Sequence, residues 1–207
     1  MIYPAVYNGP IQYFARLVRE KEVILEQYDH YLKQTYRNRC LIAGPNGPLS
    51  LSVPVKRTRG KKNLFRDIRV DYDTPWNKIH WKSYEAAYSA SPFFEYFREE
   101  LLPFYEKTYQ FLLDLNVGLI EFTLGMMGLT IPLKMTDEFL PLVDEKDPRH
   151  YINPKMDIKV NDPDFKPRSY HQVFQEKNGF LPNLSILDLL FNEGARSLSI
   201  LKDSLKT

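Results

Sequence analysis

Residues 2–28 read IYPAVYNGPIQYFARLVREKEVILEQY, and this stretch decides what fold the N-terminal part is expected to have. Ile2–Val6 is a short apolar strand candidate, and Tyr7-Asn8-Gly9 follows it as a loop. Pro10 suits the first position of a helix, and apolar residues then recur at helical spacing. Val23–Tyr28 has the composition of a second strand. Strand, tight loop, helix and strand make a βαβ unit, which predicts parallel pairing and a right-handed crossover.

Further strands are expected after this unit. Cys40–Ala43 and Leu49–Val55 are apolar runs separated by Gly44-Pro45-Asn46-Gly47-Pro48. Asn-Gly between two such runs predicts a hairpin, and the neighbouring prolines predict a loop of more than two residues. Phe65–Tyr72 alternates apolar and charged residues, which predicts another strand. Residues 1–75 are therefore expected to be the sheet-rich part.

The apolar period becomes helical from Trp76 onward. This predicts a helical part over residues 76–135, including one long helix over Tyr105–Met127. Residues 141–169 contain five prolines and are expected to form an irregular excursion. Residues 170–207 should form the C-terminal helices. The predicted fold is thus one α/β domain spanning the chain, with an N-terminal βαβ unit plus hairpin strands in a mixed sheet, followed by a mainly helical C-terminal half packed on it.

The composition is typical of a globular domain. Of the 207 residues, 43% are hydrophobic and 26% are charged, which excludes wholesale disorder. Cys40 is the single cysteine, so an internal disulfide and a zinc site made of thiolates are excluded. The opening residues lack the pattern of a signal peptide, and no apolar run approaches the length of a membrane span. We expect a cytoplasmic protein without membrane insertion.

Basic residues are concentrated in one segment of the chain. Lys33–Arg69 contains ten lysines and arginines and one acid, Asp67, although the whole chain has a net charge of only +2. Such an asymmetry favours an anionic small molecule as partner, either a nucleotide sugar or another phosphate-bearing donor. A solvated basic face on a hairpin is the alternative. Nucleic acid would have only the short basic loop at residues 56–69 to bind, which argues against that partner. The oligomeric state is left open.

A first candidate site combines the ends of the two parallel strands. Asn8 and Gly9 precede the expected helix, where backbone amides and the helix dipole attract anions and glycine permits close approach. Asp29 and His30 follow the second strand. Because ligands of open parallel sheets bind outside the carboxyl ends of the strands, we expect these four residues in one crevice. A turn that serves only the fold is the alternative for Asn8 and Gly9.

A second candidate site is the sequence Tyr36-Arg37-Asn38-Arg39, which lies in the basic segment. Two guanidinium groups match the geometry of a diphosphate or a carboxylate. If residues 37–43 form a strand, then Arg37 and Arg39 lie on one face and Asn38 on the other, so the arginines could hold one anion between them. Surface arginines on an edge strand are the alternative.

His80 is the histidine chosen as candidate general base. It lies at the start of an expected helix beside Trp76 and Trp81, which is a rigid position. A histidine that only packs between aromatic residues is the alternative. Asp188 is the second candidate catalytic residue, and its alternative is a role in capping the helix that Ser185 begins.

Sequence motifs for cofactors are absent. There is no Walker loop, no G-x-G-x-x-G, no H-E-x-x-H and no G-x-S-x-G. We therefore expect neither a cofactor nor a metal.

Several stretches, taken in order, resemble the WbqC-like protein family. They are YPAVYNGPIQYF (3–14), YRNR (36–39), LSVPV (51–55), Trp76 with His80-Trp81, ASPFF (90–94), LDLN (113–116) and LSILDLLFNEG (184–194). The resemblance runs from residue 3 to residue 194. Two departures are the missing Gln-Pro pair near the start and a missing Tyr-Leu-Ser-Gly segment before Tyr170-His171-Gln172.

The resemblance implies a transferase-like protein of bacterial surface-polysaccharide biosynthesis, of the O-antigen type. The implied activity is aminoacylation of a nucleotide-linked amino sugar, with glycine as the transferred group. The polar positions that match the family are Arg37, Asn38, Arg39, His80, Asn116, Asp188 and Asn192. A non-catalytic partner or scaffold protein of a polysaccharide assembly, with the aromatic helices of residues 76–127 as its interface, is the alternative.

Overall fold

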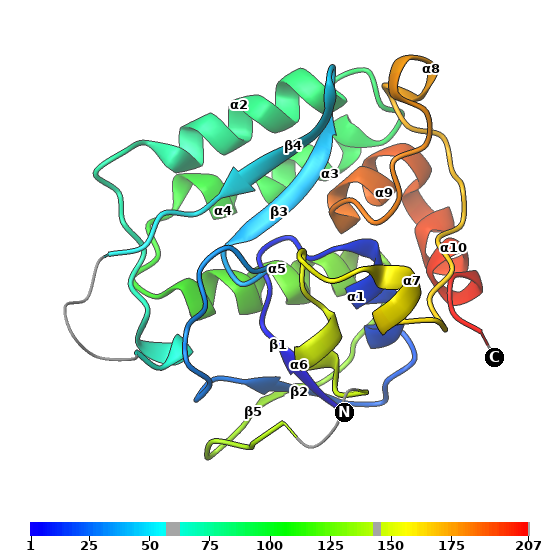
Figure 1. Ribbon diagram of the computed structural model, residues 1–207. Coiled ribbons are helices and arrows are strands. Elements are labelled where there is room, and N and C mark those ends of the chain that lie inside the picture. Colours follow the sequence, from blue (N-terminus) through cyan, green and yellow to red (C-terminus); the bar gives the residue numbers. More distant parts are fainter. Residues whose placement is uncertain (57–62, 143–145, 207) are drawn as a thin grey trace.

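The computed structural model describes residues 1–56, 63–142 and 146–206 (Figure 1). The N-terminal part contains β1 (Ile2–Pro4), α1 (Ile11–Leu17), β2 (Val23–Glu26), β3 (Arg39–Gly44), β4 (Gly47–Ser52) and η1 (Phe65–Asp67). The central helices are α2 (Trp76–Tyr88), α3 (Phe94–Leu101), α4 (Pro103–Glu106) and α5 (Leu112–Met126). The remaining elements are β5 (Leu133–Met135), α6 (Pro148–Tyr151), α7 (Ile158–Asn161), α8 (Gln175–Asn178), α9 (Ile186–Glu193), η2 (Gly194–Arg196) and α10 (Ser197–Asp203).

The predicted βαβ unit is confirmed. β1 and β2 are parallel, with Ile2 opposite Ile24, and α1 forms the connection between them. β5 adds a third parallel strand beside β2. The sequence did not predict β5, because three residues with half-exposed ends give no readable period. The strands thus form a parallel sheet in the order β1-β2-β5, and the hairpin forms a separate antiparallel sheet.

The hairpin of β3 and β4 is confirmed, but its predicted loop length is wrong. The ladder continues to the pair Gly44 and Gly47, so the loop is only Pro45-Asn46. Gly47 has φ +109°, a conformation that glycine adopts without steric cost. Pro48 is still part of the ladder, opposite Ala43. The prolines are therefore accommodated inside the hairpin rather than in a longer loop.

Two other predicted elements are interrupted in the structure. Phe65–Tyr72 begins with η1 and continues as an extended segment with isolated bridges at Arg69 and Val70, not as a strand of a sheet. The helix expected over Tyr105–Met127 is divided into α4 and α5, with Phe111 in an extended conformation before α5. In both segments most of the apolar residues are buried, as the sequence pattern predicts, although the backbone does not form the predicted continuous element.

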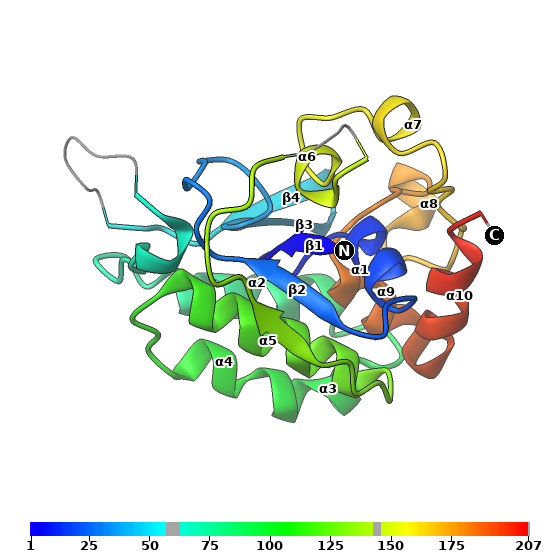
Figure 2. The same ribbon diagram turned by 90° about the horizontal axis from the view of Figure 1, so that it is seen from below.

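Helices surround the parallel sheet without covering it completely. In Figure 2, α3, α4 and α5 lie beyond β5 and α6 and α7 lie beyond β1, while the side chain of Lys134 of β5 stays 64% exposed. The mixed α/β class and the mainly helical C-terminal half are as predicted. No helix within the described residues is both long and apolar enough to cross a membrane.

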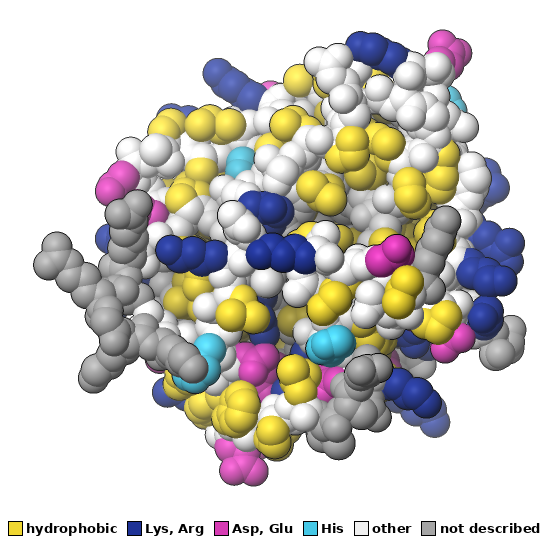
Figure 3. Space-filling view, viewed as in Figure 1, with side chains coloured by type: hydrophobic (Ala, Val, Ile, Leu, Met, Phe, Trp, Pro, Cys, Tyr) yellow, Lys and Arg dark blue, Asp and Glu magenta, His cyan; other side chains and the backbone are white. Residues whose placement is uncertain are grey.

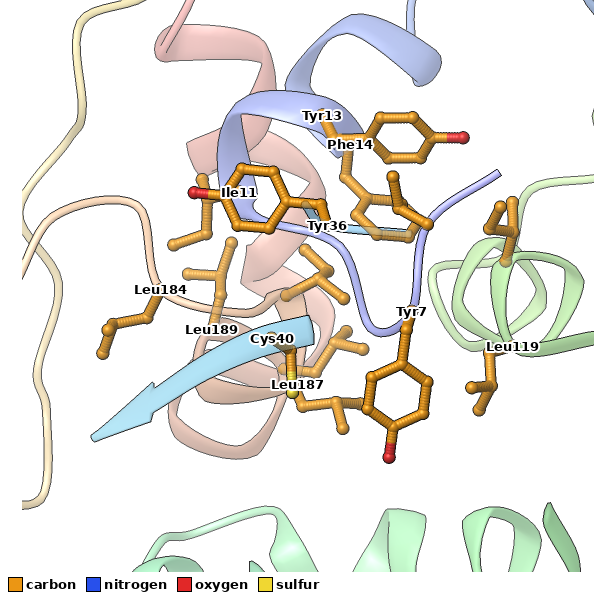
Figure 4. Close-up of a cluster of buried hydrophobic side chains, with 14 of the residues drawn as sticks. Tyr7, Ile11, Tyr13, Phe14, Tyr36, Cys40, Leu119, Leu184, Leu187 and Leu189 are labelled. Carbon is orange, nitrogen blue, oxygen red and sulfur yellow. The ribbon is translucent and has the colours of Figure 1, made fainter. Parts of the chain in front are cut away.

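The core brings together segments that are far apart in the sequence. Figure 4 shows side chains of α1, β3, α5 and α9 around the loop that carries Tyr7. Cys40 is part of this core, and burial raises the pKa of its thiol to about 12. A thiol with such a pKa stays protonated at neutral pH, which leaves Cys40 inert as a nucleophile.

The segment of residues 183–185 joins the N-terminal and C-terminal parts of the chain. Ser185 caps α9 by accepting a hydrogen bond from the Leu187 amide, as predicted. Its own amide donates to the carbonyl of Leu41, and its hydroxyl donates to the carbonyl of Asn8. The carbonyl of Leu184 accepts from the amide of Ile11 at the start of α1. One short segment thus holds α9, β3 and the loop before α1 together.

Candidate functional site

Arg37 lies beyond the carboxyl end of β2, where ligands of parallel sheets bind. Its Nη2 donates to Oδ2 of Asp29 at 2.7 Å, and its guanidinium lies over the Phe65 ring, 5.5 Å from the centroid. The strand expected over residues 37–43 begins only at Arg39, so Arg37 belongs to the preceding turn. Arg37 is therefore buried and held by an acid and an aromatic ring rather than displayed on a strand.

The guanidinium of Arg37 retains unused hydrogen-bonding capacity. Its Nε is buried and has no hydrogen-bond partner among the described residues. The same is true of the hydroxyl of Tyr31, whose ring is stacked on Phe65. Burial raises the pKa of Tyr31 to about 12, and the positive charges of Arg37 and Arg39 oppose that rise. Arg37, Arg39 and Tyr31 therefore lie close enough to interact electrostatically.

Arg39 is the accessible member of this group. It is partly exposed, and its Nε donates to the Ser52 hydroxyl at 3.3 Å across the hairpin. Figure 3 shows lysine and arginine side chains across the middle of this face, in front of the start of β3. We call Asp29, Tyr31, Arg37, Arg39 and Phe65 the strand-end site. Positive charge and unpaired polar atoms are its two distinguishing properties.

A second buried guanidinium, that of Arg149, flanks this site from the 141–169 excursion. It donates to Glu26 at 3.3 Å, to Asp147 at 2.5 Å and to the carbonyl of Leu140. Both Arg37 and Arg149 are within electrostatic reach of Glu26 and Asp29. Sequence reasoning missed Arg149, because an arginine in an irregular segment carries no signal of its partners. Its ion pair with Glu26 holds the 141–169 segment against the end of β2.

Asn8 and Gly9 are in the core rather than in an open loop. The side-chain amide of Asn8 donates to the hydroxyls of Tyr84 and Tyr105. The amide of Ile11 donates to Leu184, and that of Gln12 to the side chain of Asn183. These first amides of α1 are thus already bonded within the chain. Binding of an anion by Asn8 and Gly9 stays a prediction, and this geometry gives it no support.

Gly9→Ala is expected to reduce the free energy of unfolding by about 1–3 kcal/mol, the usual cost of overpacking. A Cβ at Gly9 would lie 2.4 Å from Cγ2 of Val6 and 3.2 Å from the Tyr13 ring. Gly125→Ala is the matched control, because a Cβ there meets no atom within 4 Å and alanine favours the helix. Denaturant unfolding of both variants checks this. Equal stability of Gly9→Ala and the wild type would contradict the packing reason.

His80 belongs to a buried network of hydroxyl groups. Its Nδ1 is 2.8 Å from the hydroxyl of Tyr7, and that hydroxyl lies 3.2 Å from the hydroxyl of Tyr105. The His80 ring also makes a hydrogen bond to the backbone of Ser52. Burial lowers the pKa of His80 to about 4, so the imidazole is neutral at neutral pH. The side chain has the protonation state of a base, but it is enclosed by Tyr7 and Ser52.

Asp188 belongs to a different buried network. It accepts hydrogen bonds from the hydroxyls of Tyr88 and Tyr170, at 2.8 and 2.6 Å, and from the amide of Gln172 at 3.3 Å. Burial raises the pKa of Asp188, while these hydrogen bonds lower it. The Ser185 amide donates to Leu41 and not to Asp188. The carboxylate therefore joins α9 to α2 and the 170–172 segment instead of completing a capping box.

The other three asparagines named from the sequence each donate to a backbone carbonyl. Asn116 bridges the carbonyls of Ala5 and Arg37, and Asn38 donates to Val53. Asn192 donates to the carbonyl of Asp188 in its own helix. The Oδ1 atoms of all three are buried and have no partner within the described part of the chain. Asn116 and Asn38 thus adjoin the strand-end site, and Asn192 adjoins the Asp188 network.

The predicted site residues therefore divide into three groups. Asp29, Arg37 and Arg39 lie together. Asn38 follows Arg37 in the chain, and Asn116 donates to the backbone carbonyl of Arg37. Asn8, Gly9 and His80 lie in the tyrosine network, which touches the first group where Arg39 and His80 both bond to Ser52. Asp188 and Asn192 form the third group. His30 is exposed.

Comparison with known protein families confirms the family resemblance of the sequence. The family model described as the WbqC-like protein family matches residues 6–156 and 143–200. The chain belongs to the WbqC-like protein family. The two matched stretches of this WbqC-like protein overlap inside the 141–169 excursion, the segment that contributes Arg149.

A curated relative is similar over nearly the whole chain. The uncharacterized protein Rv1507c of Mycobacterium tuberculosis is 27% identical over 213 residues, which cover 92% of this chain and 91% of the relative. No solved structure matches the chain significantly. Across the described ranges, no three histidine, cysteine or acidic side chains come together in a way that could hold a metal ion.

Proposed function

We propose that this WbqC-like protein binds a nucleotide-linked amino sugar at the strand-end site and transfers an aminoacyl group, such as glycyl, to its amine in bacterial surface-polysaccharide biosynthesis. In such a transfer the amine nitrogen forms a bond to the carbonyl carbon of an activated aminoacyl donor. The bond from that carbon to its leaving group breaks, and the proton of the amine passes to a base. Family membership supports the biological setting, and the strand-end site supports the ligand class.

One observation carries the ligand class: the buried Nε of Arg37, at the carboxyl end of parallel strands, has no partner among residues 1–56, 63–142 and 146–206. A buried donor left without a partner costs free energy. A diphosphate would supply acceptors to this donor and to the nearby Arg39. The partly exposed ring of Tyr31 borders the same charges, which suits a ligand that carries a flat base beside its phosphates.

The proposed base remains His80, an assignment that still rests on the sequence. Its imidazole is neutral at neutral pH, but burial lowers its pKa to about 4, which makes it a weaker base than an ordinary histidine. Arg39 and His80 meet at Ser52, so the base is adjacent to the accessible arginine. Asp188 as the residue that orients the acceptor has less support, because its hydrogen bonds are used within the core.

The scaffold alternative requires an apolar interface on the central helices. Most aromatic side chains of residues 76–127 are buried, and Phe93 and Tyr96 are the exposed large ones. Phe93 also packs close to Gly194. Two aromatic residues are a small surface for a stable partner. Ligand binding at the strand-end site is therefore the function that the geometry supports better.

Wild-type protein is expected to show a raised melting temperature with UDP-linked amino sugars and with UDP, because a ligand bound only by the folded form stabilises it. Arg39→Ala should weaken the affinity at least about tenfold, since a charge-assisted hydrogen bond contributes about 1.5–3 kcal/mol. Thermal shift and isothermal titration calorimetry with UDP-N-acetylglucosamine measure both effects.

Arg98→Ala is the matched control for Arg39→Ala. Arg98 is a similarly exposed arginine of α3 that pairs with Glu85 and Glu95 on the surface. It should bind UDP and the sugar nucleotide as the wild type does. A wild-type protein whose melting temperature is unchanged by every nucleotide sugar and by UDP at millimolar concentration would refute the proposed function.

A further inference from the structure

We infer that the carboxylate of Asp29 is an internal competitor of the ligand, occupying the place on Arg37 that a phosphate group takes on binding. The identity of the ligand rests on the proposed function, but the competition rests on the geometry of Arg37. Asp29 therefore neutralises Arg37, and any anion that binds there must displace Asp29.

The contact between Asp29 and Arg37 uses only half of a two-pronged donor. Nε and Nη2 lie on the same edge of a guanidinium group and together match two oxygens of one phosphate or carboxylate. Asp29 Oδ2 accepts a 2.7 Å hydrogen bond from Nη2, while the adjacent Nε is buried and has no partner in the described structure. A carboxylate that belonged to Arg37 alone would be expected to use both positions. A tetrahedral anion at this edge would satisfy them together.

Arg37 is fixed in place by contacts that do not involve Asp29. Its guanidinium rests over Phe65, and its backbone carbonyl accepts a 2.7 Å hydrogen bond from Asn116. Its side chain is 7% exposed, whereas that of Asp29 is 21% exposed. Asp29 therefore has a route to solvent that Arg37 lacks. The carboxylate can leave while the guanidinium keeps its position.

The surrounding charges explain why some anion is always needed at this place. A buried guanidinium is costly without a counter-ion, and burial lowers the pKa of Arg37 while Asp29 raises it. The other nearby acid, Glu26, is already paired with Arg149 and accepts from Thr136. Asp29 is thus the acid that neutralises Arg37 when no ligand is present.

Asp29→Asn is expected to tighten the binding of inorganic pyrophosphate at least about tenfold, because the amide does not compete for the cation. The variant should also gain more in melting temperature from pyrophosphate than the wild type does. Asp67→Asn is the matched control, since it removes the same charge from an exposed residue of the neighbouring η1. Isothermal titration calorimetry at fixed ionic strength should give Asp67→Asn the wild-type affinity.

A structure of the wild-type protein with pyrophosphate provides a second test that needs no variant to fold. We expect Asp29 Oδ2 to have left Arg37 and oxygens of the anion to contact Nε and Nη2. Pyrophosphate affinity that is unchanged or weaker in Asp29→Asn, or an Asp29–Arg37 contact that persists beside bound anion, overturns the inference. A pyrophosphate affinity that rises in both variants alike also overturns it.

The two proposals fail in different ways. Nucleotide sugars that bind the wild type and Asp29→Asn equally would leave the proposed function in place and refute the competition. Pyrophosphate that binds Asp29→Asn more tightly, with no binding of any nucleotide sugar, would support the competition and refute the proposed function.

Discussion

Asp188→Ala is expected to lower the free energy of unfolding by at least about 3 kcal/mol, because it leaves several buried donors unsatisfied and each costs about 1–3 kcal/mol. The substitution leaves the hydroxyls of Tyr88 and Tyr170 and the amide of Gln172 without their acceptor inside the core. Urea or guanidinium unfolding at neutral pH measures the loss. Asp188→Asn keeps the shape and one acceptor oxygen, so it should lose less.

Asp203→Ala is the control for this prediction. Asp203 is exposed near the end of α10, and surface substitutions usually change stability by less than about 0.5 kcal/mol. A loss of under about 1 kcal/mol in Asp188→Ala would show that water replaces the carboxylate without strain. It would leave Asp188 free for the catalytic role that the sequence suggests.

The second large effect is a dependence of stability on pH caused by His80. Its pKa falls from the ordinary value of 6.5 to about 4 because the ring is buried. The folded pKa is the lower one, so the stabilisation is fully present above pH 6.5 and is lost as the pH falls toward 4. A difference of this size corresponds to about 3 kcal/mol. His80→Gln should remove this contribution, so that its stability falls less between pH 6.5 and 4 than that of the wild type.

His171→Gln is the matched control for the pH experiment, because His171 is exposed. Carboxylates also titrate in this range, so the quantity to compare is the difference in slope between each variant and the wild type. His171→Gln should keep the wild-type slope. A slope in His80→Gln equal to that of the wild type would mean that His80 is accessible to protons in the folded protein.

The secondary structure could be predicted where the apolar pattern of a segment alone determines the element that it forms. The βαβ unit follows from two apolar runs around a proline-led helical period, and the structure keeps all three. The sequence did not predict β5, because β5 forms only by pairing with β2, which lies more than a hundred residues earlier in the chain. The predicted hairpin loop is too long because prolines usually interrupt a ladder, whereas here Pro45 fits the two-residue loop and Pro48 fits the ladder opposite Ala43.

The candidate site was predictable only in part, for a related reason. The strand ends predicted Asp29 beside Asn8, Gly9 and His30, whereas in the structure Asp29 pairs with Arg37, which lies in a turn and not on the expected strand. The partners of His80 and Asp188 are tyrosine hydroxyls on distant segments, which no spacing reveals. The 14% aromatic content was the available signal. Buried tyrosines need hydrogen-bond partners, and here they engage polar residues that the sequence suggested for catalysis.

The junction formed by residues 183–185 also constrains how the polypeptide reaches its native state during synthesis. The amides that open α1 find their acceptors more than 170 residues later, in Asn183 and Leu184. Near the end of the chain, the carbonyls of Lys202, Leu205 and Lys206 accept from Arg19. Contacts of such sequence separation slow folding, because a large loop must close before they form. A nascent chain that has emerged only as far as α8 therefore lacks these acceptors, and we expect it to become native only once residues 183–206 have left the ribosome.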